Sequence, residues 1–204
     1  MYPLYAIVDT GVCAARGLDP RAIADAFLRG GARLIQLRDK STSSSERLSL
    51  ADDLVRRARA AGAAIVINDR ADVARLSGAD GVHVGHDDLT VDQARVVVGA
   101  EAIVGVSTHD AAQVAAAART SASYIAVGPI YGTVTKETGY SPRGLDLVRV
   151  ARASGKSVVA IGGITLDRAR DVIAAGASSV AVISDLLTGD PEERVRQFIR
   201  SLEG

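Results

Sequence analysis

Short, nearly continuous runs of apolar and β-branched residues recur along the whole chain, and this repetition limits the folds that the chain can adopt. We identify eight such runs: LYAIVD, RLIQLRD, AAIVIND, GVHVGH, EAIVGVS, SYIAVGP, SVVAIGG and SSVAVIS. Runs of this kind are typical of strands buried on both faces, whereas a half-exposed strand would alternate apolar with polar residues. The runs therefore predict a sheet that is covered on both sides.

Ala- and Arg-rich stretches with helical spacing lie between the runs, as in residues 43–62. Gly62 and Gly176 are typical of helix C-termini, and the pairs Asp19–Pro20 and Asp190–Pro191 are typical of helix starts.

The alternation of eight strands with helices predicts an α/β protein, a (β/α)₈ TIM barrel that occupies residues 1–204 as a single domain. A chain of 204 residues is short for this fold, so the helices after the third and fourth strands must be short. A doubly wound open sheet is the alternative, but its G-x-G-x-x-G sequence is missing after the first run.

The composition excludes several classes of protein. Lys and Arg total 24, as do Asp and Glu, and aromatic residues make up only 3 %, so neither a nucleic acid nor a membrane surface is an expected partner. Cys13 is the only cysteine, which excludes an internal disulfide and a Cys-rich metal site and fits a cytoplasmic location. The N-terminal residues lack a basic segment, and no apolar run reaches the length of a membrane span. We expect a soluble protein and leave a homo-oligomer open.

Polar residues gather where the strands end, and in a barrel these ends meet on one face. They are Asp9, Gln36, Arg38, Lys40, Asn68, Asp69, His83, His86, Asp88, Ser107, His109, Thr133, Thr135, Lys136, Gly162, Gly163 and Ser184. The set carries both signs of charge, so it fits a ligand site, although structural salt bridges are an alternative explanation for part of it.

The segment QLRDK places Gln36, Arg38 and Lys40 at alternate positions, which predicts that they share one face of an extended strand. Two cations at the carboxyl end of a strand suit an anion, because Arg grips phosphate oxygens with two donors and Lys adds a mobile charge. The alternative is that Lys40 leaves the strand for solvent.

Asp69 and Asp88 follow the third and fourth runs. Two carboxylates without a cysteine cluster suit Mg²⁺ shared with the phosphates of a substrate, although either Asp alone could be a helix N-cap. His83, His86 and His109 raise a zinc alternative, but they lie on separate segments and lack helical i, i+4 spacing.

The last two runs end in VAIGGIT and VAVISDL, where TIM barrels often bind phosphate through backbone N–H groups. Gly162 and Gly163 allow a ligand to approach the main chain, or they serve only a tight turn. The loop after the sixth run carries Thr133, Thr135 and Lys136, but its lysine does not follow a glycine as it does in a P-loop.

Taken together, these segments resemble the thiamine-phosphate synthase family in register from about Leu4 to Leu187. The segments that carry the resemblance are QLRDK, INDR, GVHVGHDD, GVSTH, GPIYGTVTK, AIGGI and VAVIS. The resemblance implies a (β/α)₈ barrel. It also implies a transferase of thiamine biosynthesis that joins 4-amino-5-hydroxymethyl-2-methylpyrimidine diphosphate to a thiazole phosphate, with release of pyrophosphate.

The resemblance also implies roles for residues at matching positions. Arg38, Lys40 and Lys136 would hold the diphosphate, with Asn68 and Ser107 beside it, and Gln36 would face the pyrimidine. Thr133, Thr135, Gly163 and the backbone at Ile183–Ser184 would bind the thiazole phosphate, and Asp69 and Asp88 would ligate Mg²⁺. Arg38, Lys40, Ser107 and Lys136 would form the catalytic set. The sequence departs from the family at His86, where Gln is common.

A site with cations, hydroxyls and a metal-binding carboxylate pair fits a dissociative substitution, which the resemblance leads us to expect. In this reaction diphosphate leaves first, and the thiazole nitrogen then attacks a pyrimidine-methyl cation. The protein would supply positioning and charge stabilisation, which agrees with the lack of an obvious nucleophile–base pair. A thiazole tautomerase, with His109 in proton transfer, is one alternative. A non-catalytic regulator that binds phosphate or thiamine is the other.

Overall fold

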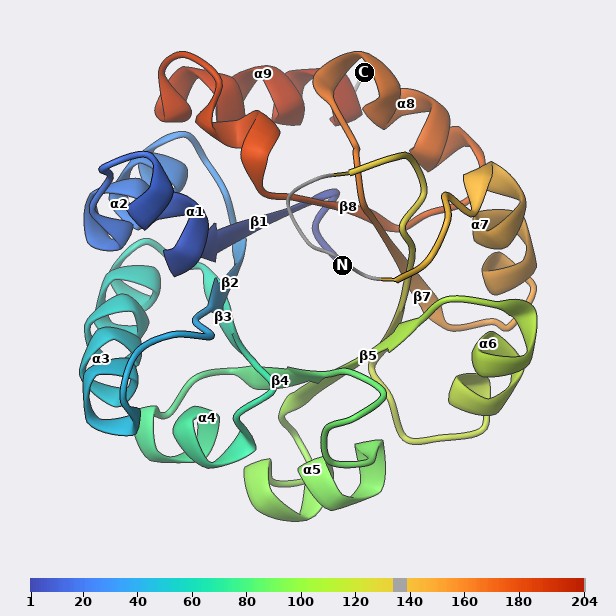
Figure 1. Ribbon diagram of the computed structural model, residues 1–204, viewed down its shortest axis with the longest axis horizontal. Coiled ribbons are helices and arrows are strands. Elements are labelled where there is room, and N and C mark those ends of the chain that lie inside the picture. The colour runs from blue at the N-terminus through green and yellow to red at the C-terminus, as the bar shows by residue number, and fades with distance from the viewer. Residues whose placement is uncertain (134–138, 204) are drawn as a thin grey trace.

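In the computed structural model the strands form a closed parallel barrel, in which each strand pairs with the next and β8 pairs with β1 (Figure 1). The structure describes residues 1–133 and 139–203. The strands are β1 (Leu4–Asp9), β2 (Leu34–Arg38), β3 (Ala64–Asn68), β4 (Gly81–Val84), β5 (Ile103–Thr108), β6 (Tyr124–Val127), β7 (Ser157–Ile161) and β8 (Ser179–Val182). The predicted (β/α)₈ barrel is confirmed, and the open sheet is excluded.

Helices form a ring around the barrel (Figure 1). Within the described residues they are α1 (Thr10–Ala15), α2 (Pro20–Arg29), α3 (Ser44–Ala60), α4 (Ala71–Ser77), α5 (Val91–Val98), α6 (Ala111–Ala118), α7 (Gly144–Arg152), α8 (Leu166–Ala174) and α9 (Pro191–Glu203), with a 3₁₀ helix η1 (Ser184–Leu187) after β8. The helices after β3 and β4 have seven and eight residues, so the prediction that they are short is confirmed. None of the described helices is long and apolar enough to cross a membrane.

The sequence signals for helix ends correspond to the observed ends. Asp19 caps α2 by accepting the N–H of Arg21, and Pro20 occupies the first helical position. Helix α1 was not anticipated from the sequence. It forms directly after β1 because Asp9 accepts the N–H of Val12 and thereby satisfies one of the helix's free donors.

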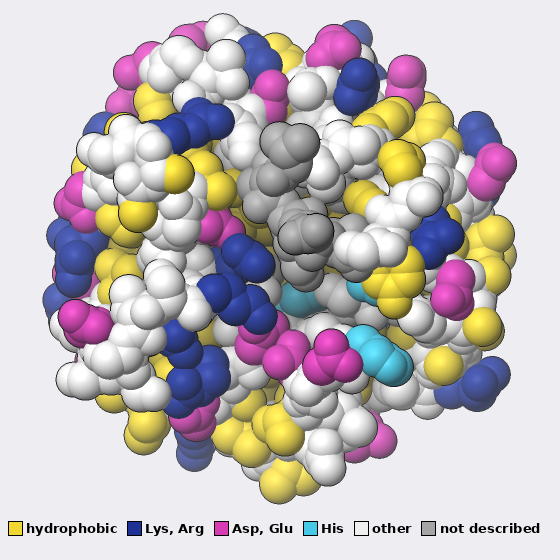
Figure 2. Space-filling view, viewed as in Figure 1, with side chains coloured by type: hydrophobic (Ala, Val, Ile, Leu, Met, Phe, Trp, Pro, Cys, Tyr) yellow, Lys and Arg dark blue, Asp and Glu magenta, His cyan; other side chains and the backbone are white. Residues whose placement is uncertain are grey.

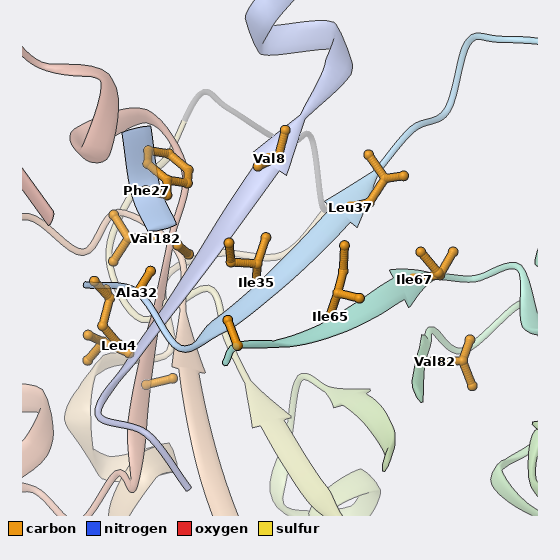
Figure 3. Close-up of a cluster of buried hydrophobic side chains, with 14 of the residues drawn as sticks. Leu4, Val8, Phe27, Ala32, Ile35, Leu37, Ile65, Ile67, Val82 and Val182 are labelled. Atoms are coloured by element: carbon orange, nitrogen blue, oxygen red, sulfur yellow. The ribbon is translucent and has the colours of Figure 1, made fainter. Parts of the chain in front are cut away.

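The side chains of each strand alternate between two apolar clusters, as the period of a strand requires. One cluster lies between the barrel and the helices, and Figure 3 shows part of it, where Phe27 of α2 lies near Val182 and other outward-facing side chains of the strands. The other cluster fills the barrel interior and contains Tyr5, Val66, Tyr124 and Val159. Polar side chains on the same interior parity, nearer the carboxyl ends of the strands, are therefore directed to the mouth of the barrel.

Cys13 of α1 lies in the outer cluster and is 1 % exposed. Burial, together with the negative charges of Asp9 and Asp19, raises the pKa of its thiol to about 11. This cysteine is therefore an uncharged, packed side chain at neutral pH.

Candidate active site

A cavity of about 900 Å³ opens at the carboxyl ends of the strands. Figure 2 shows Lys, Arg, Asp, Glu and His side chains close to the centre of this face. The predicted residues that line the cavity are Gln36, Arg38, Lys40, Asn68, Asp69, Asp88, Ser107, Thr133, Gly163, Ile183 and Ser184. The structure thus brings together every described residue to which the resemblance assigns a role, and Asp9 lies behind Arg38 as its partner. Thr135 and Lys136 lie outside the described residues.

The end of β2 supplies Gln36 and Arg38 to the barrel interior. Arg38 Nη1 lies 2.5 Å from Asp9 Oδ2 on the neighbouring strand, where Asp9 and Arg38 are partners in the sheet register. Asp9 is almost completely buried, and its other oxygen caps α1. One carboxylate therefore holds the guanidinium at the cavity wall and also anchors the adjacent helix.

Lys40 does not continue the strand, so the prediction that it shares an extended strand with Gln36 and Arg38 is wrong. The reason is Asp39, whose buried carboxylate accepts the N–H groups of Ser41 and Thr42 and turns the chain. Although burial alone raises the pKa of Asp39, these bonds and those from the hydroxyls of Thr42 and Thr10 outweigh it and hold that pKa below its usual value. Lys40 still reaches the cavity.

Asp69 and Asp88 follow β3 and β4 and form a pair of carboxylates on the same side of the cavity as Lys40. Lys40 Nζ forms an ion pair with Asp69, and Asp88 Oδ2 accepts the N–H of Gly85 at 2.7 Å. Burial and the neighbouring Asp69 raise the pKa of Asp88. Neither Asp caps a helix, because the N-cap of α4 is Arg70 and that of α5 is Thr90.

The backbone at Asp69 is unusual, with φ of +63°, and among the described residues other than glycine it alone has a positive φ. This conformation is uncommon for a residue with a side chain and is concentrated at functional sites. Two neighbouring oxygen-donor side chains, one of them with a pKa raised by burial and by the other carboxylate, fit a hard cation such as Mg²⁺. No group of three or more His, Cys, Asp and Glu side chains is placed to hold a metal among the described residues. A magnesium ion at this pair would take its other oxygen ligands from water and substrate.

The floor of the cavity is a chain of hydrogen bonds across the barrel interior. Gln36 Nε2 donates to the Tyr5 hydroxyl at 2.9 Å, and the Tyr5 and Tyr124 hydroxyls lie 3.2 Å apart. The Tyr124 hydroxyl lies 2.9 Å from His83 Nδ1, and His83 Nε2 lies 2.8 Å from Ser107 Oγ. Five side chains from five strands therefore form one continuous line.

Sequence reasoning did not single out Tyr5 or Tyr124 for the site. A tyrosine within an apolar run is usually a packed aromatic side chain, and both residues do pack edge to face, with centroids 5.9 Å apart. The signal that could have found them is Gly105, the register partner of Tyr124 on β5. A Cβ at Gly105 would lie 2.0 Å from the Tyr124 ring, so the glycine leaves the space that this ring occupies.

The loops after β7 and β8 form the opposite wall. Gly162 and Gly163 have φ of +101° and +62°, and a Cβ on Gly163 would lie 2.4 Å from the carbonyl oxygen of Gly132. Both glycines are thus needed for the turn, and both line the cavity. Ile183 precedes η1, so a short extra helix follows β8, as in the phosphate sites of many TIM barrels.

Within residues 1–133 and 139–203, the three histidines are not placed together as ligands of a zinc ion. His83 belongs to the floor, and His109 Nδ1 lies 2.6 Å from the carbonyl oxygen of Gly128, which can only accept, so Nδ1 carries the proton. His109 also stacks on Tyr140, with centroids 4.1 Å apart. His86 lines the cavity.

Comparisons with known proteins agree with this geometry. The family model described as thiamine monophosphate synthase matches residues 4–186. A thiamine-phosphate synthase from Koribacter versatilis is 44 % identical over 98 % of this chain and 95 % of its own length. The corresponding protein from Natronomonas pharaonis is 43 % identical over 96 % of this chain and 93 % of its own.

A solved structure gives the same result. The thiamine phosphate pyrophosphorylase from Pyrococcus furiosus superposes with a TM-score of 0.89 at 29 % identity, over 98 % of this chain and 95 % of that one. The family model and the full-length relatives together establish the assignment: this chain belongs to the thiamine monophosphate synthase family.

Proposed function

We propose that the protein is a thiamine-phosphate synthase, which joins 4-amino-5-hydroxymethyl-2-methylpyrimidine diphosphate to a thiazole phosphate and releases pyrophosphate. What supports this proposal is that one cavity has a polar floor between two walls, each of which carries groups suited to an anion. Arg38 and Lys40 lie on one wall, and Gly163 and Ser184 lie on the other. A reaction of two phosphorylated substrates needs both walls at once. Residues 1–204 act as one catalytic unit in the cytoplasm.

The diphosphate binds on the wall formed by β2, β3 and β4. Arg38, held by Asp9, offers its remaining N–H donors to phosphate oxygens, and Lys40 can exchange its contact with Asp69 for the substrate. Asn68 precedes Asp69 at the end of β3 and adds an uncharged donor. Lys136, on the loop after β6, completes the cationic set by its match to the family.

Asp69 and Asp88 would hold Mg²⁺ at this wall. When bound, the ion neutralises negative charge on the departing diphosphate. Before substrate enters, the positive charge of Lys40 offsets the repulsion between the two carboxylates and keeps Asp69 and Asp88 close together.

The thiazole phosphate binds on the wall formed by the loops after β7 and β8. The backbone N–H groups near Gly163 and Ser184, with the hydroxyls of Thr133 and Thr135, suit its phosphate group. The thiazole ring then lies over the floor, on the side opposite the diphosphate. This places the attacking nitrogen and the leaving group on either side of the pyrimidine methylene carbon.

The reaction proceeds by departure of diphosphate before attack. The C–O bond to diphosphate breaks, and electron donation from the amino group of the ring stabilises the resulting pyrimidine-methyl cation. The thiazole nitrogen then forms the new C–N bond. Arg38, Lys40 and Lys136 stabilise the charge that develops on the leaving group, and Gln36 and Ser107 hold the ring.

Turnover tests this proposal against its two alternatives. Purified protein is incubated with both substrates and Mg²⁺, and pyrophosphate release and thiamine phosphate are measured together. A synthase forms both products in equal amounts and forms neither when one substrate is omitted. Isomerisation of the thiazole alone would support a tautomerase that uses His109, and binding without any reaction would support a regulator.

A further inference from the structure

The chain of hydrogen bonds on the cavity floor ends at Gln36 and Ser107. All five of its side chains line the cavity. Tyr5 and Tyr124 are fully buried, and burial raises the pKa of both phenols above the usual value. Each hydroxyl therefore remains neutral and has one proton to donate.

A neutral hydroxyl has one proton and can accept two hydrogen bonds. Every contact in the line is therefore a hydrogen bond, with an acceptor in the line for both tyrosine protons, only when all members point the same way. The structure fixes the direction at one end, where Gln36 Nε2 donates to Tyr5. Either hydroxyl could donate in the contact of Tyr5 with Tyr124, and the role of His83 Nδ1 depends on its tautomer. The first bond therefore sets the rest: Tyr5 donates to Tyr124, and Tyr124 donates to His83 Nδ1. A neutral imidazole that accepts at Nδ1 carries its proton at Nε2, so His83 donates to Ser107 Oγ.

This direction decides what the two ends offer a ligand. One N–H of the Gln36 amide is bonded to Tyr5, and the carbonyl oxygen of the same amide is the acceptor that remains for a ligand. Ser107 accepts from His83, so its own proton is available for donation. The floor therefore presents an acceptor at Gln36 and a donor at Ser107. A 4-aminopyrimidine complements them with its amino N–H and a ring nitrogen, whereas a 4-oxopyrimidine offers an acceptor in place of the amino group.

The opposite direction is the other one in which every contact is a hydrogen bond and both tyrosine protons have an acceptor in the line. It would place the proton of His83 on Nδ1 and turn the Gln36 amide, so that both ends would change roles together. The ends are coupled because the Tyr124 hydroxyl joins the Tyr5 side of the line to the His83 side. Tyr124 is held there by stacking on His83, with centroids 5.6 Å apart, and by the absence of a side chain at Gly105.

We propose that Tyr124 is a positioning residue whose hydroxyl couples Gln36 to Ser107, so that the floor selects a 4-aminopyrimidine over a 4-oxopyrimidine. The inference rests on the proposed function and adds the group that enforces the choice of ring. Tyr124 acts through its neighbours and need not touch the substrate.

The test compares Tyr124→Phe with wild-type protein and with Tyr2→Phe, a control at an exposed tyrosine. The probes are 4-amino-5-hydroxymethyl-2-methylpyrimidine and its 4-oxo analogue, measured by calorimetry. Loss of one neutral hydrogen bond in the line should lower the preference for the amino probe by about 5- to 10-fold in Tyr124→Phe. In turnover, KM for the pyrimidine diphosphate should rise while KM for the thiazole phosphate stays unchanged.

The tautomer of His83 separates the two roles that Tyr124 could have. If Tyr124 were only structural, Tyr124→Phe would leave this tautomer unchanged. The chain has three histidines, so ¹⁵N-labelled imidazoles can be assigned with His86→Gln and His109→Gln. With the amino probe bound, wild-type His83 should carry its proton on Nε2, and Tyr124→Phe should give a mixture of tautomers.

Two results would overturn the inference. One is a proton on Nδ1, or on both nitrogens, of His83 in the wild-type complex with the amino probe. The other is wild-type selectivity in Tyr124→Phe. Neither measurement needs turnover, so a lack of pyrophosphate release would count against the synthase reaction and not against the coupling.

Discussion

Replacement of Asp9 by Asn tests whether this carboxylate holds Arg38 in place. Asn keeps an oxygen that can accept the N–H of Val12 but loses the charge that faces the guanidinium at 2.5 Å. A hydrogen bond to a charged group contributes about 1.5–3 kcal/mol, and removal of one partner of a fully buried pair costs about 3–5 kcal/mol. Because the Arg38 side chain is still 18 % exposed, the lower range applies. We expect the free energy of unfolding to fall by about 2 kcal/mol.

A double-mutant cycle in urea isolates this contribution. Arg38→Met removes the charge and keeps much of the aliphatic stem, so Asp9→Asn should cost less than about 0.5 kcal/mol in that background or even stabilise the protein. Asp19→Asn is the matched control. Asp19 also caps a helix but has no ion pair among the described residues, and Asn is an equally good cap. An equal cost of Asp9→Asn in both backgrounds would refute the argument.

The same substitution should affect catalysis through the position of Arg38. If the full 2 kcal/mol were lost from transition-state binding, kcat/KM would fall by about 30-fold, since about 1.4 kcal/mol is tenfold in rate. Steady-state kinetics with the pyrimidine diphosphate varied gives this value directly. If kcat/KM fell only for the thiazole phosphate, Arg38 would serve that substrate and the assignment to the diphosphate would be wrong.

Three further predictions follow from other parts of the site. Hydrogen bonds hold the pKa of Asp39 below its unfolded value, so its stabilisation is present above about pH 4 and is lost as the pH falls through the folded pKa. The urea midpoints of wild type and Asp39→Asn should therefore converge below that pH, and a constant difference would contradict the assignment. Asp88→Ala should abolish the response of turnover to Mg²⁺ and leave the circular dichroism spectrum unchanged, whereas a preserved Mg²⁺ titration would remove Asp88 from the metal site. Gly163→Ala should raise KM for the thiazole phosphate more than KM for the pyrimidine diphosphate, because its Cβ would lie 2.4 Å from the Gly132 oxygen at a positive φ; equal changes would contradict the division into two walls.

Strand parity explains why much of the site could be predicted from the sequence. Gln36, Arg38, Asn68 and Ser107 occupy alternate positions at the ends of buried runs, and such positions face the interior of a closed barrel. Lys40 was misplaced on the strand because the turn depends on the four hydrogen bonds that Asp39 accepts from Thr10, Ser41 and Thr42. Three of these bonds are local, as in an Asx turn, but the bond from Thr10 of α1 forms only when the barrel is assembled.

The floor could not be predicted, because its contacts join residues far apart in the sequence. Tyr5 and Tyr124 are 119 positions apart and meet only when the barrel closes. The sequence shows each of them as one aromatic residue in an apolar run. Their chemical role comes from which hydroxyl reaches which neighbour, and that is a property of the assembled interior.

The buried cysteine in α1 has a practical consequence for studies of this corner of the protein. A thiol with a pKa of about 11 that is 1 % exposed reacts with a thiol reagent only when the helix around it opens. Cys13 is the only cysteine of the chain and lies four residues after Asp9, which holds Arg38. The rate at which Cys13 is labelled therefore reports how often α1 opens beside the diphosphate wall, with no engineered cysteine. The decrease of that rate in the presence of pyrophosphate measures how strongly a bound product restrains this helix.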